Sequence, residues 1–451
     1  MLAFKIVDLF SSMIMLPMLI FIIIIDLFIN KKSTVPTRKL MVLDTSYTFE
    51  MIKERKLYQS VICRDLNGYF EHVWSVHPFA TVITPKNPSD ICGDIATIPI
   101  SDRHTIIEGR VGRYLFLKTF PVLNFILSQG RIYFFLNALI RKERICAVRV
   151  GDPYYIGIMG LCLSRSNRVP LIVRIGCNYD MAFKNTGKPA MPRLFRKRWI
   201  EKLIDRFVLK RADLVAGANE DNLNYAILNG ARTKFTTIFR YGNLIHESHF
   251  KEPKERTGGK EALAELGISN RCFALYIGRL ESVKHPDHIL RVIAAVKARG
   301  YDLAGLLVGD GRMENELKQM MSNHGIENDI FFAGNRDQEW LASIIPHATV
   351  VISPHTGRAL SEAVLGGVPI VAYDIDWQSE VVRTGETGEL VGYQNWTAMA
   401  DSVVKLLKDP KYAKRMGTNA RNTVLEMMDP VKLNQHERNE YNKLFERYFS
   451  N

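Results

Sequence analysis

The sequence predicts an α/β protein with two doubly wound, Rossmann-like parallel-sheet domains facing a cleft, preceded by an N-terminal hydrophobic helix. Three observations lead to this fold class. Apolar, β-branched runs alternate with helical patterns at the spacing of parallel βα units. The alternation stops at a polar, charged stretch, residues 247–270, and then restarts. Residues 9–29 are almost entirely apolar, and 451 residues are enough for two separate cores.

Domain boundaries follow from these changes in pattern. We expect an N-terminal anchor with a basic flank (1–36), a first Rossmann-like domain (37–246), a linker (247–270), a second Rossmann-like domain (271–435) and a C-terminal helix (436–451). The cleft is expected at the carboxyl ends of the strands, where doubly wound folds bind their ligands.

The N-terminal segment, residues 9–29, is 21 residues long and is interrupted by Pro17 and Asp26. That length is enough to cross a bilayer. The flank after it carries four cations, Lys31, Lys32, Arg38 and Lys39, whereas Lys5 alone precedes it. This asymmetry favours a spanning anchor with the rest of the chain in the cytosol. A segment lying in the membrane surface and a cleaved signal peptide are the alternatives. Six scattered cysteines without a Cys-x-x-Cys pair also indicate reduced thiols, with neither disulfides nor a zinc site.

The chain is basic, with a formal net charge of +13, and residues 101–200 hold 18 Lys and Arg against five Asp and Glu. Such an excess favours a polyanion or an anionic lipid surface as partner. A nucleic-acid partner is not expected, because no zinc finger, RNA-binding strand or compact basic helix is present. Residues 109–144 mix large apolar side chains with Arg and Lys. That pattern suits either a lipid headgroup boundary or a buried helix pair with a charged outer face.

The predicted elements can be followed along the chain. In the first domain, strands cover residues 39–45, 72–83, 145–155 and 171–176, a helix covers 157–170, and a helix, a turn and a strand cover 199–219. In the second domain, strands at 273–280, 303–311, 329–334 and 349–354 alternate with helices at 285–300, 312–325 and 337–348. A helix over 358–365, a strand from Pro369 and helices over 395–410 and 411–428 follow, and a charged helix runs to the C-terminus.

Two cations, Arg279 and Lys284, lie five residues apart between the first strand of the second domain and its helix. Gly278 allows the backbone to turn tightly before them. Cations beside a helix N-terminus suit a diphosphate, and the alternative is that both are ordinary surface side chains. Gly309 lies in a glycine-rich turn, 308–311, which is weak evidence because most such turns bind nothing.

Glu362 lies early in a predicted helix, with Ser353 and Thr356 as candidate N-caps and a glycine pair (366–367) at its end. Its carboxylate would accept hydrogen bonds from the hydroxyls of a ribose at the cleft. Alternatively it pairs only with Arg358, four residues before it, which would contribute about 0.3 kcal/mol.

Several segments of the second half carry a resemblance: YIGRLESVKHPDHIL, LLVGDGRMENELKQM, DIFFAGNRDQEWLASIIPHATVVISP and SEAVLGGVPIVAYD. In combination they resemble the GT-B glycosyltransferases, in particular the retaining family 4 (glycosyl transferases group 1). The likeness covers about residues 271–425 and extends more loosely into the first half. It implies a GT-B fold whose first domain binds the acceptor and whose second domain binds a nucleotide-sugar.

The resemblance also implies roles for the matching residues. Arg279 and Lys284 would hold the donor diphosphate and act as the catalytic groups. Glu362 would bind the donor ribose, and the turn containing Gly334 and Asn335 would face the nucleobase. The other implied donor-binding residues are Gly278, Gly309, Arg358, Ala359 and Leu360.

The sequence departs from the family pattern in two places. The family commonly has a further glutamate where this chain has Pro354, and a histidine where it has Gly176. The first change puts contacts to the donor sugar in doubt, and the second removes a group near the transferred sugar. His355, Arg358 and Asn178 are substitutes by position, although a structural role is the expectation for each.

Asp374 and Asp376 offer a different chemistry. In the GT-A glycosyltransferases an Asp-x-Asp pair at a strand end holds a divalent metal against the diphosphate. A GT-A enzyme has one sheet domain with this pair near its middle, whereas here the pair follows five strands of a second domain. We therefore expect no metal and no other cofactor.

The function that the resemblance implies is a retaining, metal-independent hexosyltransferase with a nucleotide-sugar donor. The basic first domain and the apolar N-terminus indicate a lipid-linked glycan acceptor, as in cell-surface polysaccharide or lipopolysaccharide biosynthesis. The expected location is the cytoplasmic face of a membrane, the bacterial inner membrane. The alternatives are a sugar-nucleotide epimerase on the same fold, a catalytically degenerate binding scaffold, and a metal-dependent transferase using Asp374 and Asp376.

Overall fold

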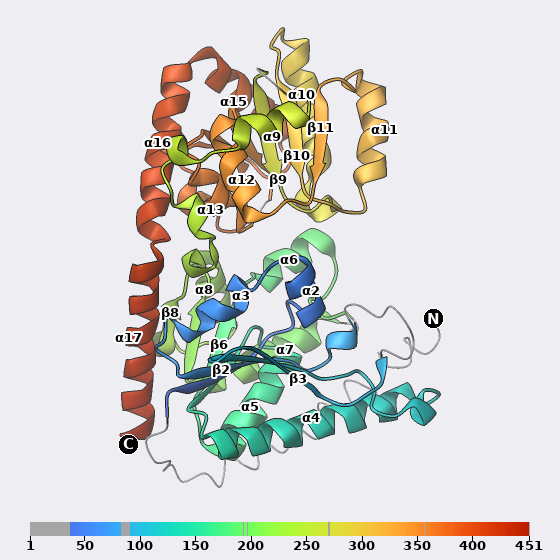
Figure 1. Cartoon of the computed structure of the whole chain (residues 1–451), viewed down its shortest axis with the longest axis vertical. Helices are drawn as coiled ribbons and strands as arrows, with labels where there is room; N and C mark the ends of the chain where they lie inside the picture. Colours follow the sequence, from blue (N-terminus) through green and yellow to red (C-terminus); the bar gives the residue numbers. More distant parts are fainter. Residues whose placement is uncertain are drawn as a thin grey trace. The chain divides into compact units, whose positions relative to one another are not determined.

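The computed structural model describes residues 37–82, 91–192, 194–195, 197–268, 271–355 and 357–450. The chain forms two compact units, one made of residues Met1–Arg240 and Val431–Asn451, the other of Tyr241–Pro430 (Figure 1). The predicted N-terminal hydrophobic helix, residues 9–29, lies outside the described residues. Within the described ranges, no helix is both long enough and apolar enough to cross a bilayer.

The first unit is built on an eight-stranded sheet of order β3-β4-β2-β1-β5-β6-β7-β8. Every neighbouring pair is parallel except β3 with β4. The strands are β1 (Lys39–Leu43), β2 (His72–His77), β3 (Ala96–Ser101), β4 (His104–Glu108), β5 (Ala147–Val150), β6 (Leu171–Ile175), β7 (Leu214–Gly217) and β8 (Thr236–Ile238). Alternate residues of β1 pack on opposite faces: Met41 and Leu43 on one, Leu40 and Val42 on the other.

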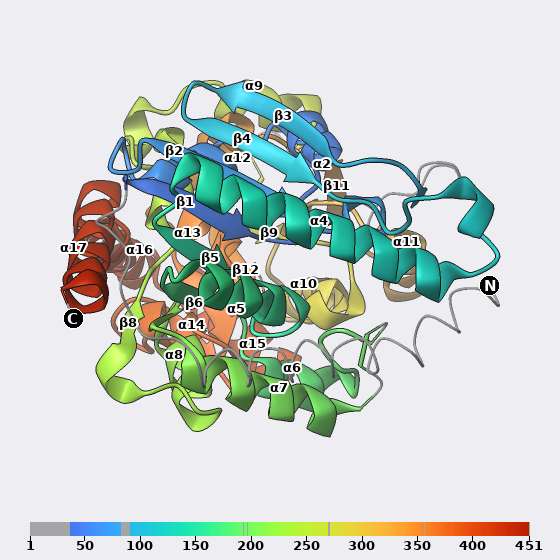
Figure 2. The same cartoon turned by 90° about the horizontal axis from the view of Figure 1, so that it is seen from below.

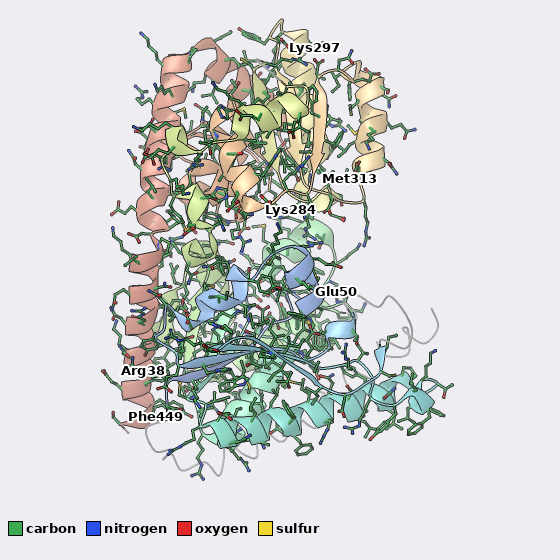
Figure 3. All side chains as sticks on the ribbon, in the orientation of Figure 1. Arg38, Glu50, Lys284, Lys297, Met313 and Phe449 are labelled. Atoms are coloured by element: carbon green, nitrogen blue, oxygen red, sulfur yellow. The ribbon has the colours of Figure 1, made fainter. Side chains whose placement is uncertain are left out.

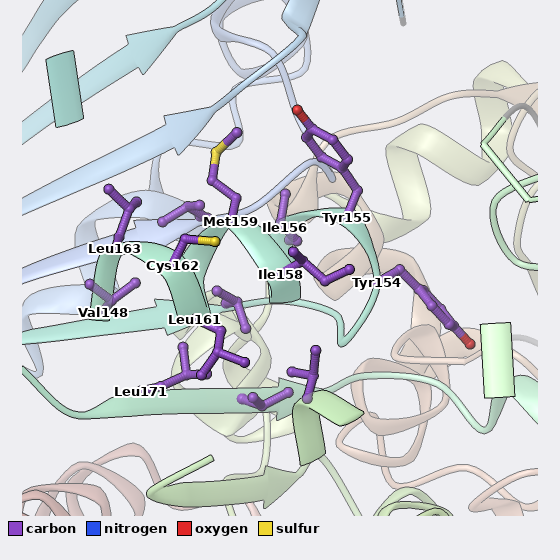
Figure 4. Packing of buried hydrophobic residues seen from close by; sticks show 14 of the residues in the cluster. Val148, Tyr154, Tyr155, Ile156, Ile158, Met159, Leu161, Cys162, Leu163 and Leu171 are labelled. Atoms are coloured by element: carbon purple, nitrogen blue, oxygen red, sulfur yellow. The ribbon is translucent and has the colours of Figure 1, made fainter. Parts of the chain in front are cut away.

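Helices cover both faces of this sheet. They are α2 (Phe49–Glu54), α3 (Gln59–Ile62), α4 (Pro121–Glu143), α5 (Tyr155–Asn167), α6 (Tyr179–Thr186), α7 (Arg198–Arg211), α8 (Glu220–Leu228) and α17 (Pro430–Phe449). Figure 2 shows α4, α5 and α7 on one face of the sheet. Helix α5 is apolar all round and lies at the centre of the core, packed on Val148 of β5 and Leu171 of β6 (Figure 4). A Cβ on Gly160 would lie 2.3 Å from Val150 Cγ1, so the glycine allows α5 to approach β5 this closely.

The second unit has a six-stranded, fully parallel sheet of order β11-β10-β9-β12-β13-β14. Its strands are β9 (Phe273–Ile277), β10 (Ala304–Val308), β11 (Ile330–Gly334), β12 (Val350–Ser353), β13 (Ile370–Tyr373) and β14 (Glu389–Val391). Its helices are α9 (Gly259–Glu265), α10 (Pro286–Ala298), α11 (Glu314–His324), α12 (Gln338–Ile344), α13 (Ala359–Val364), α14 (Gln378–Val381), α15 (Trp396–Lys408) and α16 (Pro410–Met427). Two buried clusters, one on each face, form its core.

The predicted α/β class with two Rossmann-like parallel-sheet domains is confirmed, and three local expectations differ from the structure. The stretch 247–270 is not a separate linker, because it contains α9 and buries Ala262, Leu263 and Ile268 in the core of the second unit. The C-terminal helix begins at Pro430 and belongs to the first unit. The basic, apolar stretch 109–144 is one long helix, α4, preceded by a short 3-10 turn, Leu115–Leu117, and is no helix pair. All six cysteines lie among the described residues, and none of them forms a disulfide.

Candidate active site

The carboxyl edge of the second sheet brings three predicted glycines together. The Gly278 N–H donates to the Val308 carbonyl (3.0 Å), and the Gly309 N–H donates to the Gly334 carbonyl (2.8 Å), so the turns after β9, β10 and β11 are bonded side by side. Gly309 has a φ of +137°, and a Cβ there would lie 2.0 Å from the Gly278 carbonyl oxygen. Only glycine fits this position, because both the backbone conformation and the available space exclude a side chain.

Arg279 and Lys284 lie on the loop that leaves β9 at this edge. The Tyr276 hydroxyl donates to the Arg279 carbonyl (2.9 Å), and the Leu280 N–H donates to the Asp310 carbonyl (2.8 Å), which fixes the loop while the Arg279 side chain stays exposed. Lys284 ends a 3-10 turn, Ser282–Lys284, directly before α10. Figure 3 shows Lys284 at one end of the second unit and Lys297, near the carboxyl end of α10, at the other.

The turn before α13 meets this loop. A Cβ on Gly357 would lie 3.8 Å from Lys284 Nζ, so the ammonium group lies beside the turn. His355, two residues earlier, donates from Nδ1 to the Val283 carbonyl (3.1 Å) and places Nε2 3.7 Å from Asp376 Oδ2. Lys284 and the start of α13 are therefore neighbours, as a shared ligand would require.

Glu362 is buried within α13. Its Oε1 lies 3.6 Å from Arg358 Nε, as the i,i+4 spacing predicts. Burial raises the pKa of the Glu362 carboxyl, and Arg358 and a hydrogen bond from Gln338 partly oppose that rise. Gln338 is held in turn, since its Oε1 accepts a hydrogen bond from His249 Nε2 (2.9 Å). The carboxylate thus lies in a low-dielectric position, where a hydrogen bond to a ligand is strengthened.

Gln378 is a positioning residue that the sequence analysis missed. Its fully buried amide donates to the carbonyls of Ser353 and Pro354 (both 3.3 Å) and of Tyr373 (2.9 Å), which ties the β12–α13 loop to β13. The predicted cap role of Ser353 is wrong, because its hydroxyl donates to Gln378, and among the described residues no side chain caps α13. Thr356, the other predicted cap, lies outside the described residues. No local signal marked Gln378, because its segment, Ile375 to Val382, also contains the polar residues Asp376, Ser379 and Glu380.

The remaining predicted donor residues also lie at this edge. Gly334 has a φ of +68° and ends β11, and Asn335 follows it with an exposed side chain. Ala359 and Leu360 begin α13, and Leu360 is buried in the core.

Possible metal ligands converge at one place in the part of the chain that the structure describes. The ligand atoms of His285, Asp287 and His288 all lie within 4.8 Å of one another. One nitrogen of each ring is engaged, by the Tyr393 hydroxyl for His285 (2.9 Å) and by the Tyr373 hydroxyl for His288 (2.7 Å). Burial lowers the pKa of His285 to about 4. Asp374 and Asp376 do not belong to this group.

The first unit gathers titratable groups at the carboxyl edge of its own sheet. Asp44 follows β1 and pairs with Arg64, and this pairing lowers the pKa of Asp44 although burial acts to raise it. His77 ends β2, and burial lowers its pKa to about 4. Asp152 follows β5, and burial raises its pKa to about 7. Asn178 does not join this group, because it caps α6 through the Met181 N–H (3.1 Å) and donates to Asp221 (2.9 Å).

Comparison with known proteins identifies relatives of this chain. Residues 260–423 match the sequence model of the family described as Glycosyl transferases group 1. The alpha-D-kanosaminyltransferase of Streptomyces kanamyceticus is 27% identical over 264 residues, which are 57% of this chain and 66% of that protein. The N-acetyl-alpha-D-glucosaminyl L-malate synthase of Bacillus anthracis is 29% identical over 51% of this chain. The chain thus spans 59% to 66% of the length of these two relatives.

The same architecture occurs in a solved structure. HepE of Anabaena, in complex with UDP and glucose, has a TM-score of 0.65 and 16% sequence identity, and the match covers 90% of this chain and 100% of HepE. At this identity the likeness shows the fold alone, and the predicted GT-B fold is thereby confirmed.

Proposed function

We propose that the chain, whose residues 260–423 match the group 1 glycosyltransferases, moves a hexosyl group from a nucleotide-sugar to a glycan acceptor with retention at the anomeric carbon, as in family 4. The observation that carries this proposal is the carboxyl edge of the second sheet. There Gly278, Gly309 and Gly334 are bonded side by side, Lys284 lies beside Gly357, and the buried carboxylate of Glu362 follows on α13. All of these residues lie within the matched stretch, 260–423.

In the proposed reaction, the bond between the anomeric carbon and the diphosphate oxygen breaks while the acceptor oxygen bonds to the same face of that carbon. Negative charge grows on the departing diphosphate, and Arg279 and Lys284 stabilise it. The acceptor's proton passes to the diphosphate, so no enzyme base is required and the changes at Pro354 and Gly176 are tolerated. Removing one such charge-stabilising group typically costs about 3 kcal/mol, or 100-fold or more in rate.

In this proposal the first unit binds the acceptor. Residues 101–200 of that unit carry the excess of positive charge, which complements a lipid-linked, phosphate-bearing glycan. We place the enzyme at the cytoplasmic face of a bacterial inner membrane, with residues 9–29 as its anchor and a cell-surface polysaccharide or lipopolysaccharide precursor as its acceptor.

The test is thermal unfolding of the full chain with a panel of UDP-, GDP-, ADP- and dTDP-sugars. One donor, at about 100 times its dissociation constant, should raise the unfolding temperature of the wild type by about 5 °C or more. Arg279→Ala should abolish this shift. Lys318→Ala is the matched control, since Lys318 pairs with Glu314 on the surface of α11 (2.6 Å), and it should keep the shift. If the donor raised the unfolding temperature of Arg279→Ala as much as that of the wild type, Arg279 would not bind the donor.

Activity assays separate the alternatives. Isomerisation of a nucleotide-sugar without any acceptor would indicate the epimerase. Donor binding without turnover across glycan acceptors would indicate the scaffold. We expect full transfer activity in the presence of a chelator, and loss of activity there would favour a metal-dependent transferase.

A further inference from the structure

The first unit carries an exposed apolar patch that the proposed reaction does not use. We call it the α4 patch; it consists of Leu115, Phe116, Phe120, Leu123, Leu127 and Phe134. Their exposed fractions range from 41% for Leu127 to 75% for Phe116. Large apolar residues usually occur singly on a protein surface, so seven within residues 115–134, the six of the patch and Ile126 (39% exposed), indicate a binding surface.

The spacing of these residues separates the α4 patch from the core. Phe120, Leu123, Leu127 and Phe134 follow one another at steps of three, four and seven residues, which places them on one side of α4. The other side of the helix is buried in the core of the unit through Phe125, Ile132, Leu136 and Ile140. Figure 2 shows α4 in the outer layer of this unit, next to α5.

The charge around the α4 patch has one sign. Residues 109–142 contain six Lys and Arg and no Asp or Glu. Lys118 is exposed directly after the 3-10 turn, and Arg131 is exposed between Leu127 and Phe134 on the same side of α4. A second copy of this surface would bring like charges together, which disfavours self-association. Anionic headgroups complement the cations, and the acyl boundary takes the aromatic rings.

We infer that the α4 patch docks the first unit onto an anionic lipid bilayer. Phe116, Phe120 and Phe134 enter the boundary between headgroups and acyl chains, and Lys118 and Arg131 contact the headgroups. This inference goes beyond the transfer reaction and does not depend on it, because docking needs neither donor nor acceptor.

The test is hydrogen exchange of the full chain with phosphatidylcholine vesicles, with and without about 30 mol % phosphatidylglycerol. Exchange is read peptide by peptide, so a contribution of residues 9–29 to binding does not mask the result. Anionic vesicles should protect peptides spanning 113–134 and leave those around Leu228 unchanged. The double variant Phe116→Glu/Phe120→Glu should lose this protection and bind anionic vesicles at least about tenfold more weakly. Leu228→Glu, which changes a residue of the same unit that is 78% exposed, should behave like the wild type.

Two results would overturn the inference. One is unchanged exchange over 113–134 while the protein is bound to vesicles. The other is protection of the same peptides without vesicles, because it would assign the α4 patch to a second copy or to another segment of the chain. Thermal unfolding of the double variant checks its fold, which should be intact because both side chains lie outside the core.

Discussion

Glu362 is a buried carboxylate with two donors, Arg358 and Gln338, already around it. Glu362→Gln keeps the shape of the side chain and removes its charge. We expect about fivefold weaker donor binding by calorimetry, because a hydrogen bond to a charged acceptor is worth about 1 kcal/mol more than one to a neutral acceptor. The wild-type affinity should also fall as the pH drops, starting above the usual range for Glu because burial raises the pKa. The variant should lack this pH dependence, and unchanged affinity at neutral pH would remove Glu362 from the donor site.

Asp152 supplies a prediction about stability. Burial raises its pKa to about 7, so the folded chain binds a proton between about pH 4 and 7 that the unfolded chain has released. This group therefore favours folding at low pH, and that contribution is lost as the pH rises through 7, at up to about 1.4 kcal/mol per pH unit. Asp152→Asn keeps an acceptor for the Tyr154 N–H (2.8 Å). In urea unfolding it should be more stable than the wild type at pH 8, with the difference shrinking toward pH 5. Identical profiles for the two proteins would show that Asp152 is ionised in the folded state.

Single residues were predictable where the contact is local. The Arg358–Glu362 pair follows from a spacing of four on a helix, and the glycine turns follow from the chemistry of tight bends. Gln378 was not predictable in the same way, because its three carbonyl partners come from two strands and a loop that only the folded sheet brings together.

At the scale of elements, the turns after β9 and β10 lie so close together that their backbones leave no space for a side chain at Gly309. Gly309→Ala would place a Cβ 2.0 Å from the Gly278 carbonyl oxygen at a φ of +137°. We expect a loss of more than about 2 kcal/mol in the free energy of unfolding. Gly334→Ala is the matched control, since its φ is +68° and its Cβ would meet open space, and it should cost about 1 kcal/mol. Urea unfolding of both variants measures the difference, and equal costs would show that the backbone contact is not limiting.

The elements that the sequence did not reveal lack a long apolar run. Most buried parallel strands appear as such runs and were found, but β4, which is buried and parallel to β2, was missed because only two of its five residues, Ile106 and Ile107, are apolar. Strand β3 alternates between half-buried and exposed residues, contains Pro99 and lies at the edge of the sheet, where proline is tolerated. Helix α9 lies in a polar stretch, and its few apolar residues pack against α12 and the rest of the second unit. The packing partners of α9 thus lie outside its local sequence, whereas β3 pairs with β4, which begins at His104, only three residues after β3 ends.

At the scale of the whole molecule, the chain leaves the first unit at Arg240 and returns to it at Val431. The returning helix, α17, buries Tyr441 and Leu444 in the core of the first unit. Glu437 Oε1 lies 3.0 Å from Arg149 Nη1 of β5, and both side chains are buried. Residues 431–435 were predicted to belong to the second domain, because contacts of α17 such as Glu437 with Arg149, 288 positions away, leave no local signal.

Because α17 packs in the core of the first unit, removing one of its buried contacts should destabilise that unit and not the second. Glu437→Ala would leave Arg149 buried without its counter-ion, which typically costs about 3 kcal/mol or more. Hydrogen exchange should therefore accelerate in peptides of β1 and β5 and stay unchanged in those of β9 and β10, because the second unit has its own core. Glu440→Ala is the matched control on the same helix. Glu440 pairs with Lys443 one turn away (2.7 Å), so its loss should cost less than about 0.5 kcal/mol. Equal acceleration in both units would show that they unfold as one cooperative body.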